Sequence, residues 1–100
     1  MAKPITKEEI EDLQTQNTHI HLTDVRSKEE YEKAHIPRAE NISIDKLQEA
    51  GFSKDDVIVC ICNHGNQRSQ QAAASLNEKG FENVFYLEGG TFGWLETPGP

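Results

Sequence analysis

The stretch VIVCICNHGNQRSQQAAASLNEKG, residues 57–80, predicts a buried strand joined to a helix by a short polar loop. Its first five residues, Val57–Ile61, are apolar and mostly β-branched, as is typical of a strand buried on both faces. Residues 70–79 favour a helix that Gly80 caps at its C-terminus. Cys62 therefore opens a loop whose backbone N–H groups must curl into the first turn of a helix.

The composition of this loop indicates an anion-binding site around an activated cysteine. Unpaired N–H groups and the positive end of a helix dipole stabilise a thiolate, or an oxyanion held beside it. The dipole alone contributes about 1 kcal/mol, which shifts the thiol pKa by roughly one unit. Hydrogen bonds from the loop and the guanidinium of Arg68, folded over the loop, are expected to supply the rest. Gly65 lets the backbone of the loop turn inward without a Cβ clash. Together these features predict that Cys62 is a nucleophile.

Length and composition indicate a single domain, residues 1–100, with a modest core. Only 35% of the residues are hydrophobic, and the mean hydropathy is −0.70. No stretch approaches the length of a membrane span, and residues 1–4 lead into a polar helix, so we expect a cytoplasmic protein with no membrane partner. The net charge of −7 argues against nucleic acid as a partner. Without an obvious apolar stripe, a monomer is expected.

The two cysteines, Cys60 and Cys62, indicate neither a disulfide nor a metal site. At positions i and i+2 of a strand, their Cα atoms lie near the outer limit for bridging. The sequence has no second ligand pair at zinc-like spacing, so we predict no metal site. Cys60 lies within the strand and is expected to be a core residue, with a resolving thiol as the alternative.

The rest of the chain alternates between helix and strand signals. The expected elements are helices opened by the capping boxes at residues 6–9 and 27–30, strands at 20–25, 40–43 and 82–87, and a short helix at 44–50, with regular structure ending by 98–100. This alternation predicts an α/β domain with a mostly parallel sheet. Sites in such sheets form beyond the carboxyl ends of the strands, where Cys62 and Asp24 both fall.

Four motifs, in order along the chain, resemble those of the single-domain rhodanese family of sulfurtransferases. They are Asp24-Val25-Arg26, the tyrosine-led His-Ile-Pro segment at residues 31–42, the loop from Cys62 through Gly65 to Arg68, and the LEGG and FGW sequences within residues 87–94. The resemblance runs nearly end to end. It implies a rhodanese-like α/β fold, with a five-stranded, mainly parallel sheet flanked by helices on both faces.

The resemblance also implies sulfur transfer without a cofactor. Cys62 would take the outer sulfur of thiosulfate or of a persulfide and hand it to cyanide or to a small-molecule or protein thiol. The residues that would bind the anionic donor, chiefly through backbone N–H groups, are Asn63, His64, Gly65, Asn66, Gln67, Arg68 and Ser69. Asp24 and Arg26 are expected to support the site through structural hydrogen bonds and an ion pair.

Two departures from the family pattern leave other activities open. Five residues separate Cys62 from Arg68, where the family commonly has four, and this spacing is that of phosphatases and arsenate reductases with the same fold. Asn63 also stands where many thiosulfate users carry a basic residue. The alternatives are therefore a phosphatase or arsenate reductase, for which no convincing general acid follows the loop, and a non-catalytic binding module, which would not need the thiol.

Overall fold

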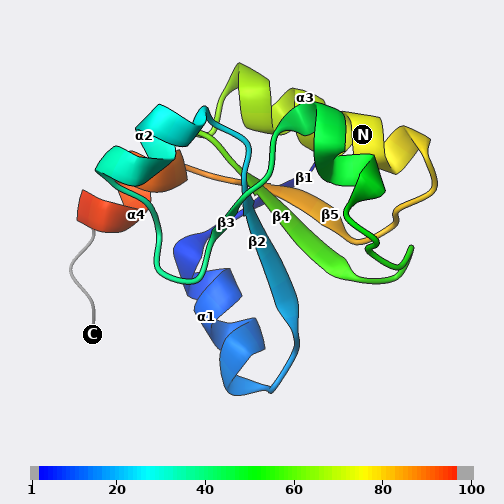
Figure 1. Cartoon of the computed structure of the whole chain (residues 1–100). Coiled ribbons are helices and arrows are strands. Elements are labelled where there is room, and N and C mark those ends of the chain that lie inside the picture. The colour runs from blue at the N-terminus through cyan, green and yellow to red at the C-terminus, as the bar shows by residue number, and fades with distance from the viewer. Residues whose placement is uncertain (1–2, 97–100) are drawn as a thin grey trace.

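Alternating strands and helices build a five-stranded sheet in the computed structural model, which describes residues 3–96 (Figure 1). The strands are β1 (Lys3–Ile5), β2 (Ile20–Asp24), β3 (Glu40–Asn41), β4 (Val57–Ile61) and β5 (Val84–Leu87). The helices are α1 (Lys7–Thr15), α2 (Lys28–Lys33), the 3-10 helix η1 (Ile44–Glu49), α3 (Gln67–Glu78) and α4 (Gly90–Glu96). The strand order is β1-β5-β4-β2-β3, and every pairing is parallel because helical connections return the chain to the same end of the sheet.

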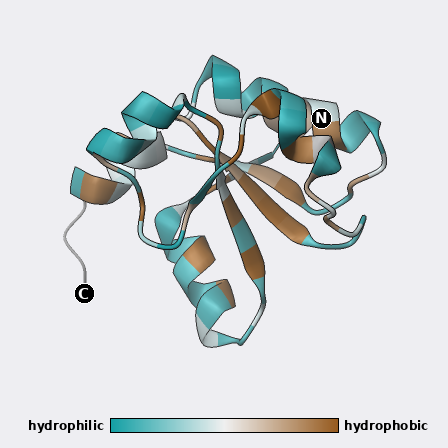
Figure 2. Cartoon of the chain, viewed as in Figure 1, coloured by the Kyte–Doolittle hydropathy of each residue, from teal (hydrophilic) through white to brown (hydrophobic). Residues whose placement is uncertain are grey.

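The helices cover both faces of the sheet and bury two apolar clusters. Strand β4 divides between them, because its side chains alternate: Ile58 and Cys60 join one cluster, Val59 and Ile61 the other. The first cluster also holds residues of α3 and η1, and the second includes the fully buried Ile10 of α1. Figure 2 shows the hydrophobic residues along the central strands and hydrophilic ones on the outer turns of the helices. The predicted fold is confirmed, with a sheet that is wholly parallel.

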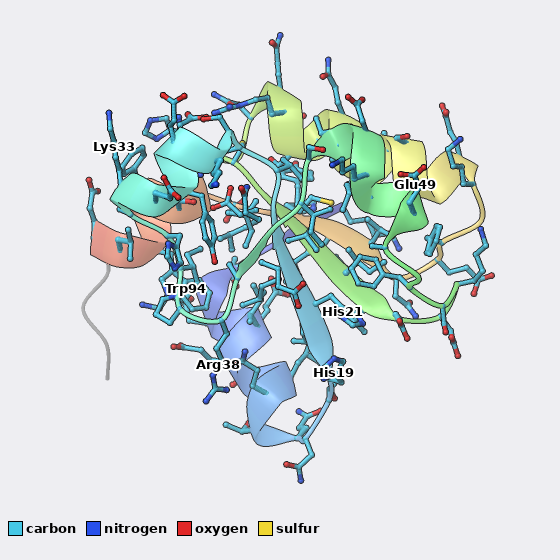
Figure 3. All side chains as sticks on the ribbon, in the orientation of Figure 1. His19, His21, Lys33, Arg38, Glu49 and Trp94 are labelled. Carbon is cyan, nitrogen blue, oxygen red and sulfur yellow. The ribbon has the colours of Figure 1, made fainter. Side chains whose placement is uncertain are left out.

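Two elements were not predicted from the sequence, β1 and α4. Strand β1 is three residues long, pairs with β5 alone at the edge of the sheet, and contains Pro4, which an edge strand tolerates. Helix α4 is held against the start of α1, where the Lys7 ammonium donates to the Trp94 carbonyl (3.3 Å) and lies 5.0 Å from the Trp94 ring. Figure 3 shows Trp94 between these two helices.

Other boundaries differ by a few residues from those expected. Helix α3 begins at Gln67 rather than at residue 70, and β5 begins at Val84 rather than at residue 82. The predicted end of regular structure at 98–100 lies outside the described residues. None of the helices described is both long enough and apolar enough to cross a membrane. The single domain of residues 1–100 and the monomeric state stay predictions.

Candidate active site

The loop that follows β4 turns sharply inward at Gly65. This residue has φ +74°, a conformation that favours glycine, and a Cβ there would lie 2.5 Å from the Leu87 carbonyl oxygen and 2.9 Å from the Gly89 nitrogen. Any larger residue would therefore push the loop away from the end of β5. The need for glycine at position 65, predicted from the sequence, is confirmed.

The turn that opens α4 supports the other side of this loop. The Thr91 N–H donates to the Cys62 carbonyl (2.8 Å), and the Phe92 N–H donates to the Asn63 carbonyl (3.1 Å). Gly90, with φ +62°, allows this approach because a Cβ on it would lie 2.5 Å from the Asn63 carbonyl. The main chain around the cysteine is thus fixed by a segment far away in sequence.

The sulfur of Cys62 lies among hydrogen-bonding groups of the loop and of the first turn of α3. Its Sγ is 3.1 Å from Ser69 Oγ and 3.7 Å from Asn66 Oδ1. Burial raises the pKa of the Cys62 thiol, but hydrogen bonds from the Ser69 side chain and from the backbone of Ser69, Asn66 and Gly65 outweigh burial and lower that pKa. The pKa moves in the direction that the sequence predicted.

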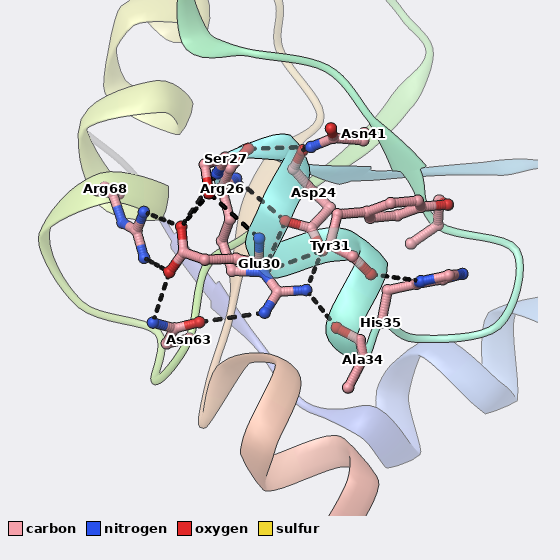
Figure 4. A network of polar contacts seen from close by, with 11 residues as sticks. Asp24, Arg26, Ser27, Glu30, Tyr31, Ala34, His35, Asn41, Asn63 and Arg68 are labelled. Atoms are coloured by element: carbon pink, nitrogen blue, oxygen red, sulfur yellow. Dashed lines mark hydrogen bonds and ion pairs between the residues drawn. The ribbon is translucent and has the colours of Figure 1, made fainter.

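Arg68 is paired with a carboxylate of another helix. Its guanidinium forms two hydrogen bonds with the Glu30 carboxylate of α2, Nη1 to Oε1 at 2.8 Å and Nη2 to Oε2 at 3.1 Å (Figure 4). These bonds, and to a smaller extent the charge of Cys62, raise the pKa of Arg68. The guanidinium thus has a carboxylate partner that the sequence did not predict, and its role at the anion site stays a prediction.

Asp24 and Arg26 form the predicted ion pair, at the carboxyl end of β2. Arg26 Nη2 lies 2.7 Å from Asp24 Oδ2, and the two residues are 3% and 0% exposed. The guanidinium also donates to Asn63 Oδ1 (3.2 Å) and to the Ala34 carbonyl (2.7 Å). The pair therefore links the residue after Cys62 to the end of α2, which is a supporting contact.

Glu30 is a site residue that sequence reasoning missed. It completes the capping box of α2, accepting hydrogen bonds from the Ser27 N–H (3.0 Å) and hydroxyl (3.1 Å). The same carboxylate accepts from Asn63 Nδ2 (3.1 Å) and from Arg68. Figure 4 shows it at the centre of this network. The capping-box pattern reveals only the local role, because the loop residues lie 33 and 38 positions further along the chain.

The other predicted loop residues form the outer surface of the site. His64, Asn66 and Gln67 are exposed, and the His64 ring lies 5.3 Å from the Phe92 ring. Cys62 itself is 0% exposed, so a donor must displace loop atoms to reach its sulfur. Within residues 3–96, no group of three or more His, Cys, Asp or Glu side chains is arranged to hold a metal ion.

Comparison with known proteins decides the family. The rhodanese-like domain model matches residues 6–97. The chain is 42% identical over 80 residues to the thiosulfate sulfurtransferase GlpE of Pseudomonas syringae pv. syringae, covering 76% of this chain and 73% of that protein. The chain belongs to the rhodanese-like family. The resemblance found in the sequence is thus confirmed.

Solved structures agree with this assignment to the rhodanese-like family. The human single-domain sulfurtransferase TSTD1 superposes with a TM-score of 0.85 at 25% identity. The match covers 99% of this chain and 100% of the TSTD1 chain. A rhodanese-related protein from Thermoplasma volcanium has a TM-score of 0.78 at 29% identity, with 98% of this chain and 95% of that chain covered.

One relative found by sequence is much longer than this chain. The putative sulfur carrier protein YrkF of Bacillus subtilis is 35% identical over 77 residues, but the chain spans only 41% of that relative.

Proposed function

We propose that this rhodanese-like chain is a thiosulfate-type sulfurtransferase that carries sulfane sulfur as a persulfide on Cys62. The observation that carries the proposal is the position of the Cys62 sulfur, at the carboxyl end of β4 among donors of the loop and of Ser69 that lower its pKa. A low thiol pKa leaves more thiolate at neutral pH, and the thiolate is the nucleophile. Relatives named thiosulfate sulfurtransferase, over most of the chain, support the same reaction.

The reaction has two displacement steps at sulfur. The Cys62 thiolate attacks the outer sulfur of the donor, its S–S bond breaks, and the leaving group departs with the electron pair: sulfite from thiosulfate, a thiolate from a persulfide. Cyanide or an acceptor thiolate then attacks the outer sulfur of Cys62–S–S⁻ and regenerates the thiolate. No external oxidant or reductant is consumed, in keeping with ping-pong nucleophilic catalysis.

The loop suits the anionic outer sulfur of this intermediate. The contacts of Gly65 with the end of β5 and of Gly90 with Asn63 set the course of the main chain, so that, once a donor has reached the sulfur, the loop N–H groups are at hand to stabilise the charge. His64, Asn66 and Gln67 are the exposed residues that first meet a donor or an acceptor. A small anionic donor and a thiol or cyanide acceptor fit such a site.

The five-residue spacing between Cys62 and Arg68 favours a phosphatase or arsenate reductase as the second candidate. That chemistry needs a general acid for the leaving group. Glu30, the carboxylate that contacts the loop residues Asn63 and Arg68, has its pKa held well below the usual range by hydrogen bonds from Arg68 and from the Ser27 N–H. It stays ionised at neutral pH and has no proton to give, so sulfur transfer is the better supported function.

Mass measurement of the Cys62 peptide tests the proposal directly. The protein is incubated with thiosulfate, with a phosphate monoester, or with arsenate, and then digested. Sulfur transfer adds one sulfur atom to Cys62, and cyanide removes that atom as thiocyanate. The matched control is Cys60→Ala, which must still gain the sulfur. Hydrolysis of the phosphate ester, reduction of arsenate, or no modification of Cys62 would each contradict the proposal.

A further inference from the structure

Both arginines at the loop have their charge compensated by a carboxylate. Arg26 is paired with Asp24, and Arg68 with Glu30. Residues 62–69 contain no other lysine or arginine. Lys33, the last residue of α2, is outside the loop and lines a pocket of about 300 Å³ with Glu30 and Asn63. What the loop itself offers an anion is therefore mainly its neutral N–H groups.

We propose that Glu30 determines donor specificity by holding the Arg68 guanidinium, which shifts selectivity away from doubly charged donors and toward donors with one negative charge. Persulfides of small thiols belong to the second class at the reacting group, and thiosulfate belongs to the first. This inference rests on the proposed sulfur transfer and adds to it the charge class of the donor.

The geometry of the pair supports this role. Two parallel hydrogen bonds of 2.8 Å and 3.1 Å fix the plane of the guanidinium against the Glu30 carboxylate. The carboxylate is also held from its own helix by Ser27 and from the loop by Asn63. The Glu30 carboxylate is thus held in position by several groups. Arg68 cannot turn toward a donor without breaking both of its hydrogen bonds to Glu30.

The Glu30 carboxylate compensates the charge of Arg68 throughout the neutral pH range. The pKa of Glu30 is well below its usual range, so the carboxylate is charged across neutral pH. The side chains of Arg68 and Glu30 are 41% and 32% exposed, so solvent weakens their fields without removing them. Neutralising Glu30 would therefore uncover a positive charge beside the loop that attracts a dianion more than a monoanion.

Two donors that differ by one charge provide the test. In methanethiosulfonate, a methyl group replaces one charged oxygen of thiosulfate, and the sulfane sulfur is the same. We expect Glu30→Gln to raise the ratio of kcat/KM for thiosulfate to kcat/KM for methanethiosulfonate about tenfold, or about 1.4 kcal/mol. The change should come mainly from a lower KM for thiosulfate. Glutamine also serves at the third position of a capping box, so the helix start is retained.

The chain contains its own matched control. Glu9 completes the same capping box at α1, with Thr6, without contacting the loop. Glu9→Gln should leave the donor ratio unchanged, and the double variant Glu30→Gln/Arg68→Gln should lose the gain. Mere loosening of the loop would lower kcat/KM for both donors together and would not change their ratio.

An unchanged or smaller ratio in folded Glu30→Gln overturns the inference. If circular dichroism shows that this variant does not fold, Arg68→Gln decides, because it leaves the Glu30 carboxylate uncompensated and must lower the ratio; no change would overturn the inference equally. If neither donor places sulfur on Cys62 of the wild-type protein, the proposed function itself fails, so the two failures are distinguishable.

Discussion

Cys60 and Cys62 are two positions apart and both are 0% exposed. The pKa values of their thiols are nevertheless shifted in opposite directions. Burial raises the pKa of Cys60 to about 12, with one opposing hydrogen bond from Thr23. Burial also raises the pKa of Cys62, but hydrogen bonds from Ser69 and the loop backbone reverse the effect. Exposed fraction therefore does not distinguish the thiol that we propose as the nucleophile from the one that we expect to be inert, whereas the number of N–H and O–H donors around each sulfur does.

One helix produces this difference. Cys60 lies within β4 and packs with Ala72 and Ala73 of α3, in an apolar cluster. Cys62 lies just beyond the strand and meets Ser69, at the first turn of the same helix, where the backbone donors have no helical partners. A shift of one helical turn is enough to exchange a dry environment for one rich in donors.

The largest expected difference is between variants that lack one thiol or the other. Cys62→Ser should lower sulfur transfer by roughly a thousandfold or more, because the nucleophile is lost. Cys60→Ala should retain activity within about threefold, since its thiol touches only the core. Steady-state transfer from thiosulfate to cyanide measures both, and similar losses in the two variants would remove the functional distinction between the cysteines.

Displacing the loop should make Cys62 resemble Cys60. Gly65→Ala places a Cβ 2.5 Å from the Leu87 carbonyl, so we expect the loop to move and the turnover rate to fall about a hundredfold. Gly51→Ala is the matched control, because Gly51 has a similar φ of +83° and nothing within 4 Å of the added Cβ. It should lose stability in urea but keep its rate; equal rates in the two variants would contradict the role of the loop.

Removing one donor should have a smaller effect on the same distinction. Ser69→Ala deletes the side-chain hydrogen bond that most lowers the pKa of Cys62, so that pKa should rise. The rising limb of the pH–rate profile should move to higher pH, with a rate loss at neutral pH of about fivefold, as expected for about 1 kcal/mol. Thiolate absorbance measured against pH checks the cause. Ser75→Ala, on the same helix, should leave both curves in place.

The smallest effect concerns stability in alkali, where Cys60 and not Cys62 is decisive. The pKa of Cys60 rises from 9.0 to about 12 on folding, so above pH 9 the unfolded chain loses a proton that the folded chain keeps. The free energy of unfolding should then fall by about 1.4 kcal/mol per pH unit between those values. Urea unfolding of wild type and Cys60→Val at pH 8 and pH 10 measures this term. Identical pH dependence in the two proteins would show that it is absent.

Local signals account for what the sequence predicted well. Strand β4 was found with its exact bounds, because an apolar β-branched run carries its own signal. Both capping boxes are present, since their hydrogen bonds span only three residues. The position of Cys62 beyond the strand, and the direction in which its pKa moves, follow from the same local pattern.

Contacts between distant segments account for what was missed. Strand β1 is paired with β5 alone. Helix α4 begins where the Thr91 N–H donates to the Cys62 carbonyl. The ion pair of Arg68 was missed because its partner, Glu30, belongs to another helix. The capping box already explained that glutamate, so no feature of the sequence indicated a second role.

The dependence of the loop on residues 87–91 has a consequence for biosynthesis. During translation, the loop emerges from the ribosome before the Thr91 and Gly90 backbone against which it rests. Parallel pairing of residues 3–5 with residues 85–87 must likewise wait for the later segment. The loop around Cys62 therefore cannot take the conformation described above until residues 87–91 have been made.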